Sequence, residues 1–144
     1  MSGASDFEVY ETSSPDDPVI DQIAAGLIEY NLQFVGRSKR HYTVAVKDSA
    51  GGLIGGAECV SAWQWMMVEN VYVVEQHRKN GVGTRLMSMV ESEARNRQCT
   101  GICLDTFTFQ ARGFYEKLGY EIFGELPDFP AGVHRYYLRK LLAQ

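Results

Sequence analysis

The sequence has few cysteines, no long apolar run and no excess of basic residues, and each of these shortages excludes a class of protein. Its three cysteines, Cys59, Cys99 and Cys103, cannot all pair with one another, so we expect reduced thiols and not a disulfide scaffold. No apolar stretch approaches the roughly 20 residues that a membrane span needs. The 14 Lys and Arg residues against 18 Asp and Glu give a net charge of −4, which argues against a general nucleic-acid binder.

Targeting and metal-binding signals are also absent. The first six residues, Met-Ser-Gly-Ala-Ser-Asp, have neither the basic nor the apolar region of a secretory signal, so we expect a cytoplasmic protein. The three histidines, His41, His77 and His134, are scattered without the spacing of metal ligands, and we expect no metal site. Because 45% of the 144 residues are hydrophobic and no linker or repeat divides them, we expect one domain over residues 1–144.

Hydrophobic spacing predicts an ordered series of strands and helices. Strand-like patterns cover residues 7–11, 42–46, 53–60, 65–74, 101–107, 120–123 and 134–141. Apolar residues three and four positions apart predict helices at residues 17–34, 82–97 and 111–118, the first capped by a carboxylate before Pro18 and ended near Gly36. An early hairpin implies antiparallel pairing, and the passage from residue 65 to 107 implies a parallel crossover. The expected fold class is therefore a mixed, layered α/β sheet.

The strongest chemical signal is the basic, glycine-containing segment 76–84, which lies between a predicted strand and a predicted helix. A helix N-terminus offers unpaired N–H groups, glycine allows close backbone approach, and Arg78 and Lys79 add positive charge. The segment therefore predicts a phosphate or pyrophosphate site. It lacks the Gly-Lys-Ser/Thr ending of a Walker A loop and the third glycine of a dinucleotide fingerprint, which disfavours ATP and NAD. A capped surface turn with two solvated cations is the alternative.

Two motifs stand in a fixed order around the 101–107 strand. Arg78-x-x-Gly81-x-Gly83 follows a Val-Tyr-Val strand, and the run from Phe114 to Tyr120 (Phe-Tyr-Glu-Lys-Leu-Gly-Tyr) comes about thirty residues later. Over about residues 7–141, these motifs and the order of elements resemble the GNAT superfamily of acetyl-CoA-dependent N-acyltransferases. The resemblance implies a mostly antiparallel central sheet with helices on both faces and a parallel pair at the splay that binds CoA.

The resemblance also implies how the chain would hold acetyl-CoA. Backbone N–H groups of the loop from Lys79 to Thr84 would hold the pyrophosphate, and backbone groups of residues 71–73 would pair with the pantetheine arm. Lys79 departs from the family pattern, which often has glycine directly after the arginine. The expected cofactor-binding residues are Val71, Tyr72, Val73, Arg78, Lys79, Asn80, Gly81, Val82, Gly83 and Thr84.

Tyr115 and Glu69 are the candidate catalytic residues. Acyl transfer to an amine requires a neutral amine, a polarised thioester carbonyl and a proton for the leaving thiolate. The resemblance places Tyr115 as the proton donor to the leaving thiolate, and the alternative for Tyr115 is a packing role. It also implies that the N–H near Val73 polarises the thioester carbonyl. Glu69 is a carboxylate in an otherwise apolar strand and is the candidate base, with an ion pair to Arg40 or Arg135 as the alternative.

The expected activity is transfer of an acetyl group from acetyl-CoA to a primary amine of a small molecule, by direct attack in a ternary complex. A non-catalytic acyl-CoA-binding module and an acetyltransferase for a protein lysine or N-terminus are the alternatives. Homodimers are common in the family, and this chain's residues leave that question open. The amine could contact residues whose alternative role is packing: Tyr30, Asn31, Trp63, Trp65, Phe107, Phe109, Gln110, Phe129, His134 and Tyr136.

Overall fold

The computed structural model describes residues 6–143. The chain forms two compact units, Met1–Arg37 and Ser38–Gln144. One helix, α1 (Pro18–Asn31), lies in the first unit, and the sheet and the other helices lie in the second. Within the described residues, no helix has the length and apolar character that crossing a membrane requires.

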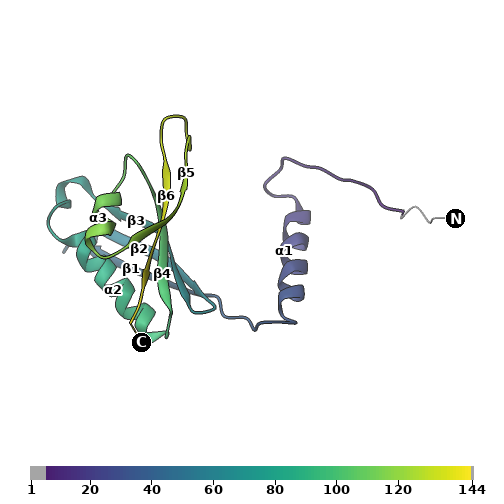
Figure 1. Cartoon of the computed structure of the whole chain (residues 1–144), viewed down its shortest axis with the longest axis horizontal. Helices are drawn as coiled ribbons and strands as arrows, with labels where there is room; N and C mark the ends of the chain where they lie inside the picture. The colour runs from purple at the N-terminus through teal and green to yellow at the C-terminus, as the bar shows by residue number, and fades with distance from the viewer. Residues whose placement is uncertain (1–5, 144) are drawn as a thin grey trace. The chain divides into compact units, whose positions relative to one another are not determined.

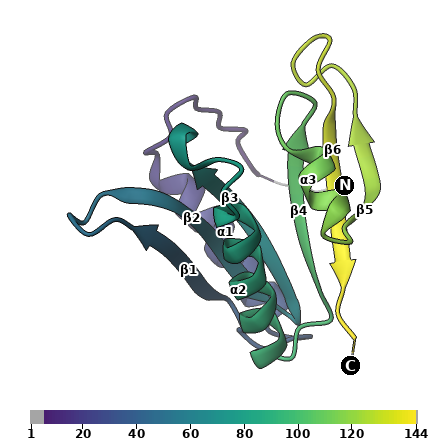
Figure 2. The ribbon, with the colours of Figure 1, turned by 90° about the vertical axis from the view of Figure 1, so that its left-hand side faces the viewer.

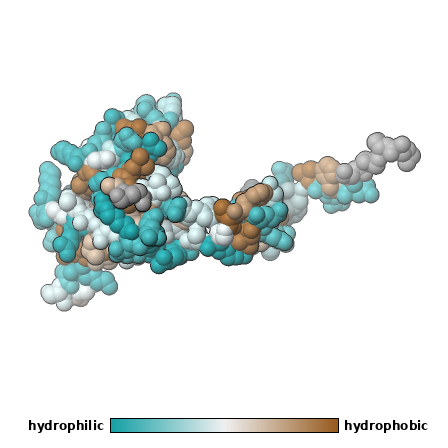
Figure 3. Space-filling model, turned by 60° about the horizontal axis from the view of Figure 1, so that its bottom comes forward, coloured by the Kyte–Doolittle hydropathy of each residue, from teal (hydrophilic) through white to brown (hydrophobic). Residues whose placement is uncertain are grey.

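Helix α1 begins where the sequence predicts and ends earlier. The Asp17 carboxylate accepts the Val19 N–H at 2.9 Å, and Pro18 occupies the first turn, where its missing N–H costs nothing. The chain leaves the helix after Asn31, whose carbonyl accepts the N–H groups of both Phe34 and Val35, so Gly36 does not cap it. None of the helical residues is buried, and Figure 3 shows hydrophobic surface on this unit.

The predicted strand over residues 7–11 is wrong. These residues join no ladder, and Phe7, Val9 and Tyr10 are 75%, 89% and 67% exposed. An alternating pattern makes a strand only when a neighbouring strand supplies hydrogen-bond partners, and none does so here. Instead, the Tyr10 hydroxyl donates to the Asp17 carboxylate at 2.6 Å.

The second unit is built on a six-stranded sheet of order β1-β2-β3-β4-β6-β5. All neighbouring strands are antiparallel except β3 and β4, so the predicted mixed sheet with one parallel pair is confirmed. The predicted hairpin is also confirmed, with the Asp48 carboxylate accepting the N–H groups of Ala50 and Gly52 in its turn. The strands are β1 (Arg40–Lys47), β2 (Leu53–Ala62), β3 (Trp65–Val73), β4 (Gly101–Phe107), β5 (Glu121–Leu126) and β6 (Arg135–Leu141).

Helices α2 (Val82–Asn96) and α3 (Arg112–Lys117) lie on the same side of this sheet (Figure 1). Their apolar residues and the facing strand residues form one core, in which Met66, Leu86 and Ile102 are completely buried. Removing this apolar surface from water is the main force that fixes the two helices against the strands. A helix on the opposite face stays a prediction, because α1 belongs to the other unit.

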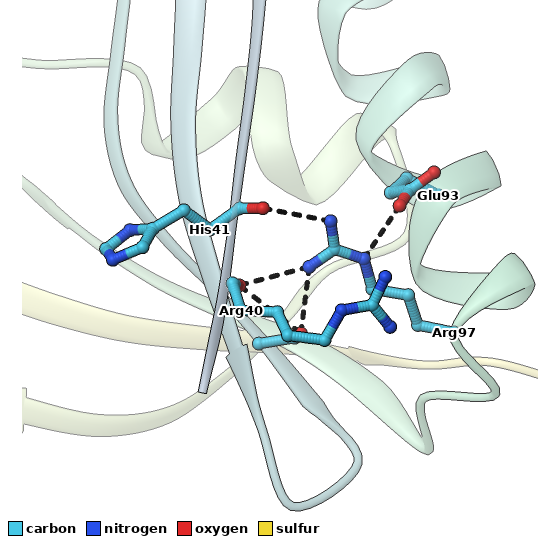
Figure 4. A network of polar contacts seen from close by, with 5 residues as sticks. Arg40, His41, Glu93 and Arg97 are labelled. Atoms are coloured by element: carbon cyan, nitrogen blue, oxygen red, sulfur yellow. Dashed lines mark hydrogen bonds and ion pairs between the residues drawn. The ribbon is translucent and has the colours of Figure 1, made fainter. Parts of the chain in front are cut away.

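A polar network fixes the C-terminal end of α2 to the edge of the sheet (Figure 4). Arg97 donates to the carbonyls of Arg40 and His41, each at 3.0 Å, and to the Ser61 hydroxyl at 2.9 Å. Its Nε also pairs with Glu93, one helical turn earlier, at 2.7 Å. Because one guanidinium holds two carbonyls of β1, the helix cannot slide along the sheet without breaking charge-assisted hydrogen bonds. The network therefore also fixes the position of the helix N-terminus.

Strands β3 and β4 separate soon after they meet. They pair only from Trp65 to Met67 on β3 and from Gly101 to Cys103 on β4, and beyond that point they diverge (Figure 2). In the described structure, the later part of β3 therefore has a paired edge toward β2 and an unpaired edge toward β4. The short helix η1 (Glu75–His77) and the loop to α2 follow directly at the open end.

Candidate active site

A cavity of about 1110 Å³ opens between the diverging strands. It is lined by the end of β3, the loop before α2, the end of β4, helix α3 and Arg135 on β6. Its volume lies just above the usual range of ligand-binding pockets, about 300–1,000 Å³, so it offers space for an extended ligand.

Most of the predicted site residues meet in this cavity. Both catalytic candidates, Glu69 and Tyr115, line it. Asn80 is exposed and does not line it, and Val82 instead packs against the core. The predicted cofactor-binding residues that line the cavity are Val71, Tyr72, Val73, Arg78, Lys79, Gly81, Gly83 and Thr84.

The loop before α2 has the backbone shape of an anion-binding turn. Lys79 and Gly81 adopt left-handed conformations, with φ of 70° and 83°. Gly81 is the N-cap of α2, and no side chain accepts a hydrogen bond there, so the first-turn N–H groups remain available to a ligand. The Arg78 Nε donates to the Val73 carbonyl at 2.9 Å, which ties the loop to the end of β3.

The unpaired edge of β3 presents backbone groups to the cavity. The Val74 N–H donates to the Ile54 carbonyl of β2 at 2.8 Å, whereas the Val73 carbonyl turns the other way and accepts from Arg78. Because successive residues of a strand direct their backbone groups to opposite sides, the N–H groups of Val71 and Val73 face the splay. These N–H groups can pair with an extended chain that contains amides, such as the pantetheine arm of CoA.

Gly83 lets α2 and α3 approach each other. A Cβ at this position would lie 3.2 Å from Cζ of Phe114, which is tighter than an ordinary contact. The Phe114 ring in turn packs edge-on against the Tyr115 ring, with centroids 5.1 Å apart. Glycine at position 83 therefore also sets the packing of the candidate acid, a contact that the sequence motif does not reveal.

Tyr115 is 7% exposed, and it lines the cavity. Burial raises the pKa of its phenol to about 12, with further contributions from Cys59 and Asp105. The phenol therefore carries its proton at neutral pH, the form that a proton donor needs. Burial also raises the pKa of the neighbouring Tyr120, whose hydroxyl is buried without a hydrogen-bond partner among the described residues.

Glu69 stands at a β-bulge. Asn70 pairs with Glu58 and Val68 pairs with Cys59, so Glu69 is the extra residue on β3. Bulges turn side chains out of the regular alternation and are common beside active sites. Neither alternative ion pair, with Arg40 or with Arg135, forms in the described structure, and Arg135 pairs with Asp105 instead. The Glu69 carboxylate is exposed and lines the cavity.

Three of the candidate acceptor-binding residues line the cavity: Phe107, Phe109 and Gln110. The rings of Phe107 and Phe109 stack at 5.4 Å with an interplanar angle of 7°. The Gln110 Oε1 accepts from the Thr106 hydroxyl at 3.1 Å and from the Phe107 N–H at 3.0 Å, so its carbonyl end holds the turn after β4.

The other candidates have different surroundings. Trp65 lies at the closed end of the splay, where it pairs with Gly101, and Tyr136 is buried beneath the Arg112 guanidinium. His134 is bound to Glu125. Phe129 contacts Phe107 and Arg135 outside the cavity lining. Tyr30 and Asn31 belong to the first unit, and Trp63 forms the turn between β2 and β3.

Asp105 is a cavity residue that was not among the site residues expected from the sequence. It lines the cavity from β4, directly before Thr106 and Phe107, which also line it. The available signal was the same as for Glu69, namely a carboxylate in an otherwise buried strand.

Comparisons with known proteins agree with the fold. The model of the acetyltransferase (GNAT) family matches residues 7–120, so the chain belongs to that family. The sequence is 32% identical to an acetyltransferase of Agrobacterium fabrum over 79% of this chain and 84% of that protein. It is 38% identical to a blasticidin-S acetyltransferase of Streptomyces morookaense, over 65% of this chain and 66%, just under two thirds, of that protein.

Solved structures show the same architecture. An acetyltransferase from Bacillus cereus superposes with a TM-score of 0.86 and 27% identity, over 94% of this chain and 98% of that one. A protein from Agrobacterium tumefaciens described as a putative acetyltransferase superposes with a TM-score of 0.87 and 28% identity, over 94% of this chain and all of that one. The chain is an acetyltransferase of the GNAT family.

Proposed function

We propose that this acetyltransferase moves the acetyl group of acetyl-CoA to a primary amine of a small molecule, by direct attack in a ternary complex. The observation that carries the proposal is the single cavity in which an anion-binding turn, an unpaired strand edge and two candidate catalytic side chains meet. The family match spans residues 7–120 and so crosses both compact units, which favours one functional domain over residues 1–144. The proposed location is the cytoplasm.

The residues present fit acetyl-CoA. The first-turn N–H groups of α2, with Arg78 and Lys79 beside them, suit the pyrophosphate, and the N–H groups of Val71 and Val73 suit the amides of the pantetheine arm. When bound, acetyl-CoA supplies the acetyl group as a thioester. Placed at the carbonyl oxygen, the Val73 N–H would stabilise its developing negative charge.

Glu69 and Tyr115 divide the proton transfers. Glu69 takes one proton from the bound ammonium, directly or through water, which frees the nitrogen lone pair to form the new C–N bond. As the C–S bond breaks, the Tyr115 hydroxyl gives its proton to the sulfur and regains one from the acylated nitrogen. The overall change is an ammonium and a thioester converted to an amide, a thiol and one proton, which Glu69 passes to solvent.

A small-molecule acceptor is favoured by the similarity to a protein named as an acetyltransferase of blasticidin S, a small molecule. A non-catalytic acyl-CoA-binding protein would have no use for an unpaired carboxylate and a protonated phenol in the same cavity.

The first experiment is a thermal-shift assay with acetyl-CoA, NAD and ATP. A ligand at about 100 times its Kd adds roughly 2.7 kcal/mol of stability, worth several degrees in a domain of this size. We expect acetyl-CoA alone to raise the melting temperature. The absence of a shift would remove the cofactor assignment.

The second experiment measures release of the CoA thiol with blasticidin S, tyramine, spermidine and a lysine-containing peptide. Release with a small amine and not with the peptide is the expected result. Binding of acetyl-CoA without release for any acceptor would favour the acyl-CoA-binding module, and release with the peptide alone would favour a protein substrate.

A further inference from the structure

Two carboxylates line the cavity, and their surroundings differ. Glu69 on the β3 bulge forms no ion pair in the described structure. Asp105 on β4 pairs with Arg135 on β6, whose Nε and Nη2 lie 2.9 and 2.8 Å from the same oxygen, Oδ2. The other oxygen, Oδ1, accepts no hydrogen bond from the described residues. Asp105 therefore has one oxygen held by Arg135 and one without a hydrogen bond from the described residues, and its side chain, 30% exposed, lines the cavity.

Arg135 is itself held in place by aromatic rings. Its guanidinium carbon lies 4.9 Å from the Phe129 centroid, 5.3 Å from Tyr137 and 5.4 Å from Phe107. A guanidinium enclosed by three rings loses little further freedom when it binds a carboxylate, so the Asp105 side chain is oriented before any ligand arrives.

The charges of the cavity are distributed unevenly. Arg78, Lys79 and His77 line it from the loop before α2, where the anionic end of acetyl-CoA is expected. Two carboxylates and one cation, Arg135, line it from β3, β4 and β6, so one negative charge remains in excess at this end. Asp105 lies close enough to Tyr115 to raise the pKa of the phenol. The stacked Phe107 and Phe109 rings lie next to Asp105 along the chain. A cation with a flat or apolar part fits this end of the cavity.

We propose that Asp105 is the residue that binds the acceptor, with Oδ1 accepting a hydrogen bond from its ammonium, and that Arg135 is the positioning residue for this carboxylate. The inference rests on the proposed function and adds the residue that recognises the ammonium of the acceptor. Asp105 holds the ammonium while Glu69 takes its proton. Acetylation abolishes the positive charge, so the product loses this contact, which favours its release.

The test compares Asp105→Asn with a matched control, Glu121→Gln. Glu121 on β5 pairs at 3.0 Å with Arg139, which lies on β6 as Arg135 does, but Glu121 lies outside the cavity lining. With the best amine among blasticidin S, tyramine and spermidine, we expect Asp105→Asn to raise the KM of the amine at least tenfold, the size of a lost charge-assisted hydrogen bond. The KM of acetyl-CoA should stay within twofold, and Glu121→Gln should change neither value.

Binding and positioning are measured separately. Calorimetric titration of the same amine into the CoA-saturated protein should show at least a tenfold weaker Kd for Asp105→Asn, without any turnover. Arg135→Gln should raise the KM of the amine about threefold with little change in kcat, and Arg135→Lys should recover part of that loss. Asp105→Glu keeps the charge, so its KM and Kd for the amine should lie between those of the wild type and of Asp105→Asn. This variant shows whether a weaker affinity comes from the lost charge or from a fold defect.

The outcomes distinguish the two proposals. Turnover by the wild type with an unchanged KM and Kd in Asp105→Asn would overturn the role of Asp105 and leave the acetyltransferase proposal standing. Preferred use of a neutral or anionic amine would also overturn it. Binding of acetyl-CoA with no turnover of any amine by the wild type would overturn the proposed function, and this inference with it.

Discussion

The rings of Tyr115 and Tyr120 meet edge to face, with centroids 5.9 Å apart and an interplanar angle of 72°, yet only Tyr115 lines the cavity. Both side chains are buried, at 7% and 3% exposure. The two residues therefore share the same aromatic packing and differ in their access to a substrate. This difference makes Tyr115, and not Tyr120, the candidate for catalysis.

Removing the Tyr115 hydroxyl should lower activity, whereas removing the Tyr120 hydroxyl should raise stability and leave activity unchanged. Tyr115→Phe should lower kcat roughly 10²-fold or more, because the leaving sulfur loses its proton donor. Tyr120→Phe should keep kcat within twofold and stabilise the protein by about 1 kcal/mol, because a buried hydroxyl without a partner is removed. Steady-state kinetics and urea unfolding of both variants measure these effects. An unchanged kcat in Tyr115→Phe would remove this residue from the mechanism.

Stability should fall at alkaline pH. The pKa of Tyr115 in the folded protein, about 12, lies above the ordinary value of 10, so folding favours the protonated phenol. The corresponding stability is present below pH 10 and is lost as pH rises from about 10 to 12, by about 2–3 kcal/mol in total. Urea unfolding at pH 8, 10 and 11 should show the decline, and Tyr115→Phe should reduce its slope. If the stability of the wild type did not change with pH, the phenol would ionise as easily in the folded protein as in the unfolded chain.

The Glu69 carboxylate should matter for chemistry and not for folding. Glu69→Gln keeps the shape of the side chain and removes its ability to take a proton, so kcat at saturating substrates should fall roughly 10²-fold while the melting temperature stays unchanged. Glu58→Gln is the matched control, since Glu58 lies across the ladder from the bulge, is exposed and does not line the cavity. Equal activities of the two variants would assign the base to water or another group.

Lys79 combines an unfavourable backbone conformation with a useful charge. At φ 70°, a lysine is strained by about 1 kcal/mol relative to glycine. Lys79→Gly should therefore be more stable than Lys79→Ala by about that amount, while both bind acetyl-CoA more weakly than the wild type because they lose the same charge. Thermal unfolding and calorimetric titration give the two quantities. A tighter complex in Lys79→Gly would show that loop shape outweighs charge.

Gly83→Val should weaken acetyl-CoA binding and disturb the candidate acid together. The new side chain would crowd the pyrophosphate turn on one side and press on Phe114, 3.2 Å from the added Cβ, on the other. Gly113→Ala on α3 is the control, because its Cβ meets no atom within 4 Å and alanine favours the helix. Calorimetry should show a weaker Kd only for Gly83→Val, and a folded variant with normal affinity would refute the placement of the pyrophosphate.

The spacing of apolar residues along the chain predicted the helices and strands whose formation depends on residues close together in sequence. The apolar repeat through Leu86, Val90 and Ala94 predicted a helix over 82–97, and α2 covers Val82–Asn96 because those residues meet one core. The same reasoning failed at residues 7–11, where alternation found no partner strand. It also gave no sign of the tight turn at Trp63 and Gln64, which adopt φ of 46° and 70° without the asparagine or glycine typical of such a turn.

The sequence by itself determined the family, the mixed sheet and the position of the basic, glycine-containing loop, because short motifs and hydrophobic periods are properties of neighbouring residues. Only the tertiary structure decided which side chains face one another. The bulge that turns Glu69 outward depends on the register between β2 and β3, and the pairing of Asp105 with Arg135 depends on β4 and β6 being neighbours although 30 residues separate the two side chains. Register and strand order arise from the packing of the whole sheet, which no local pattern records.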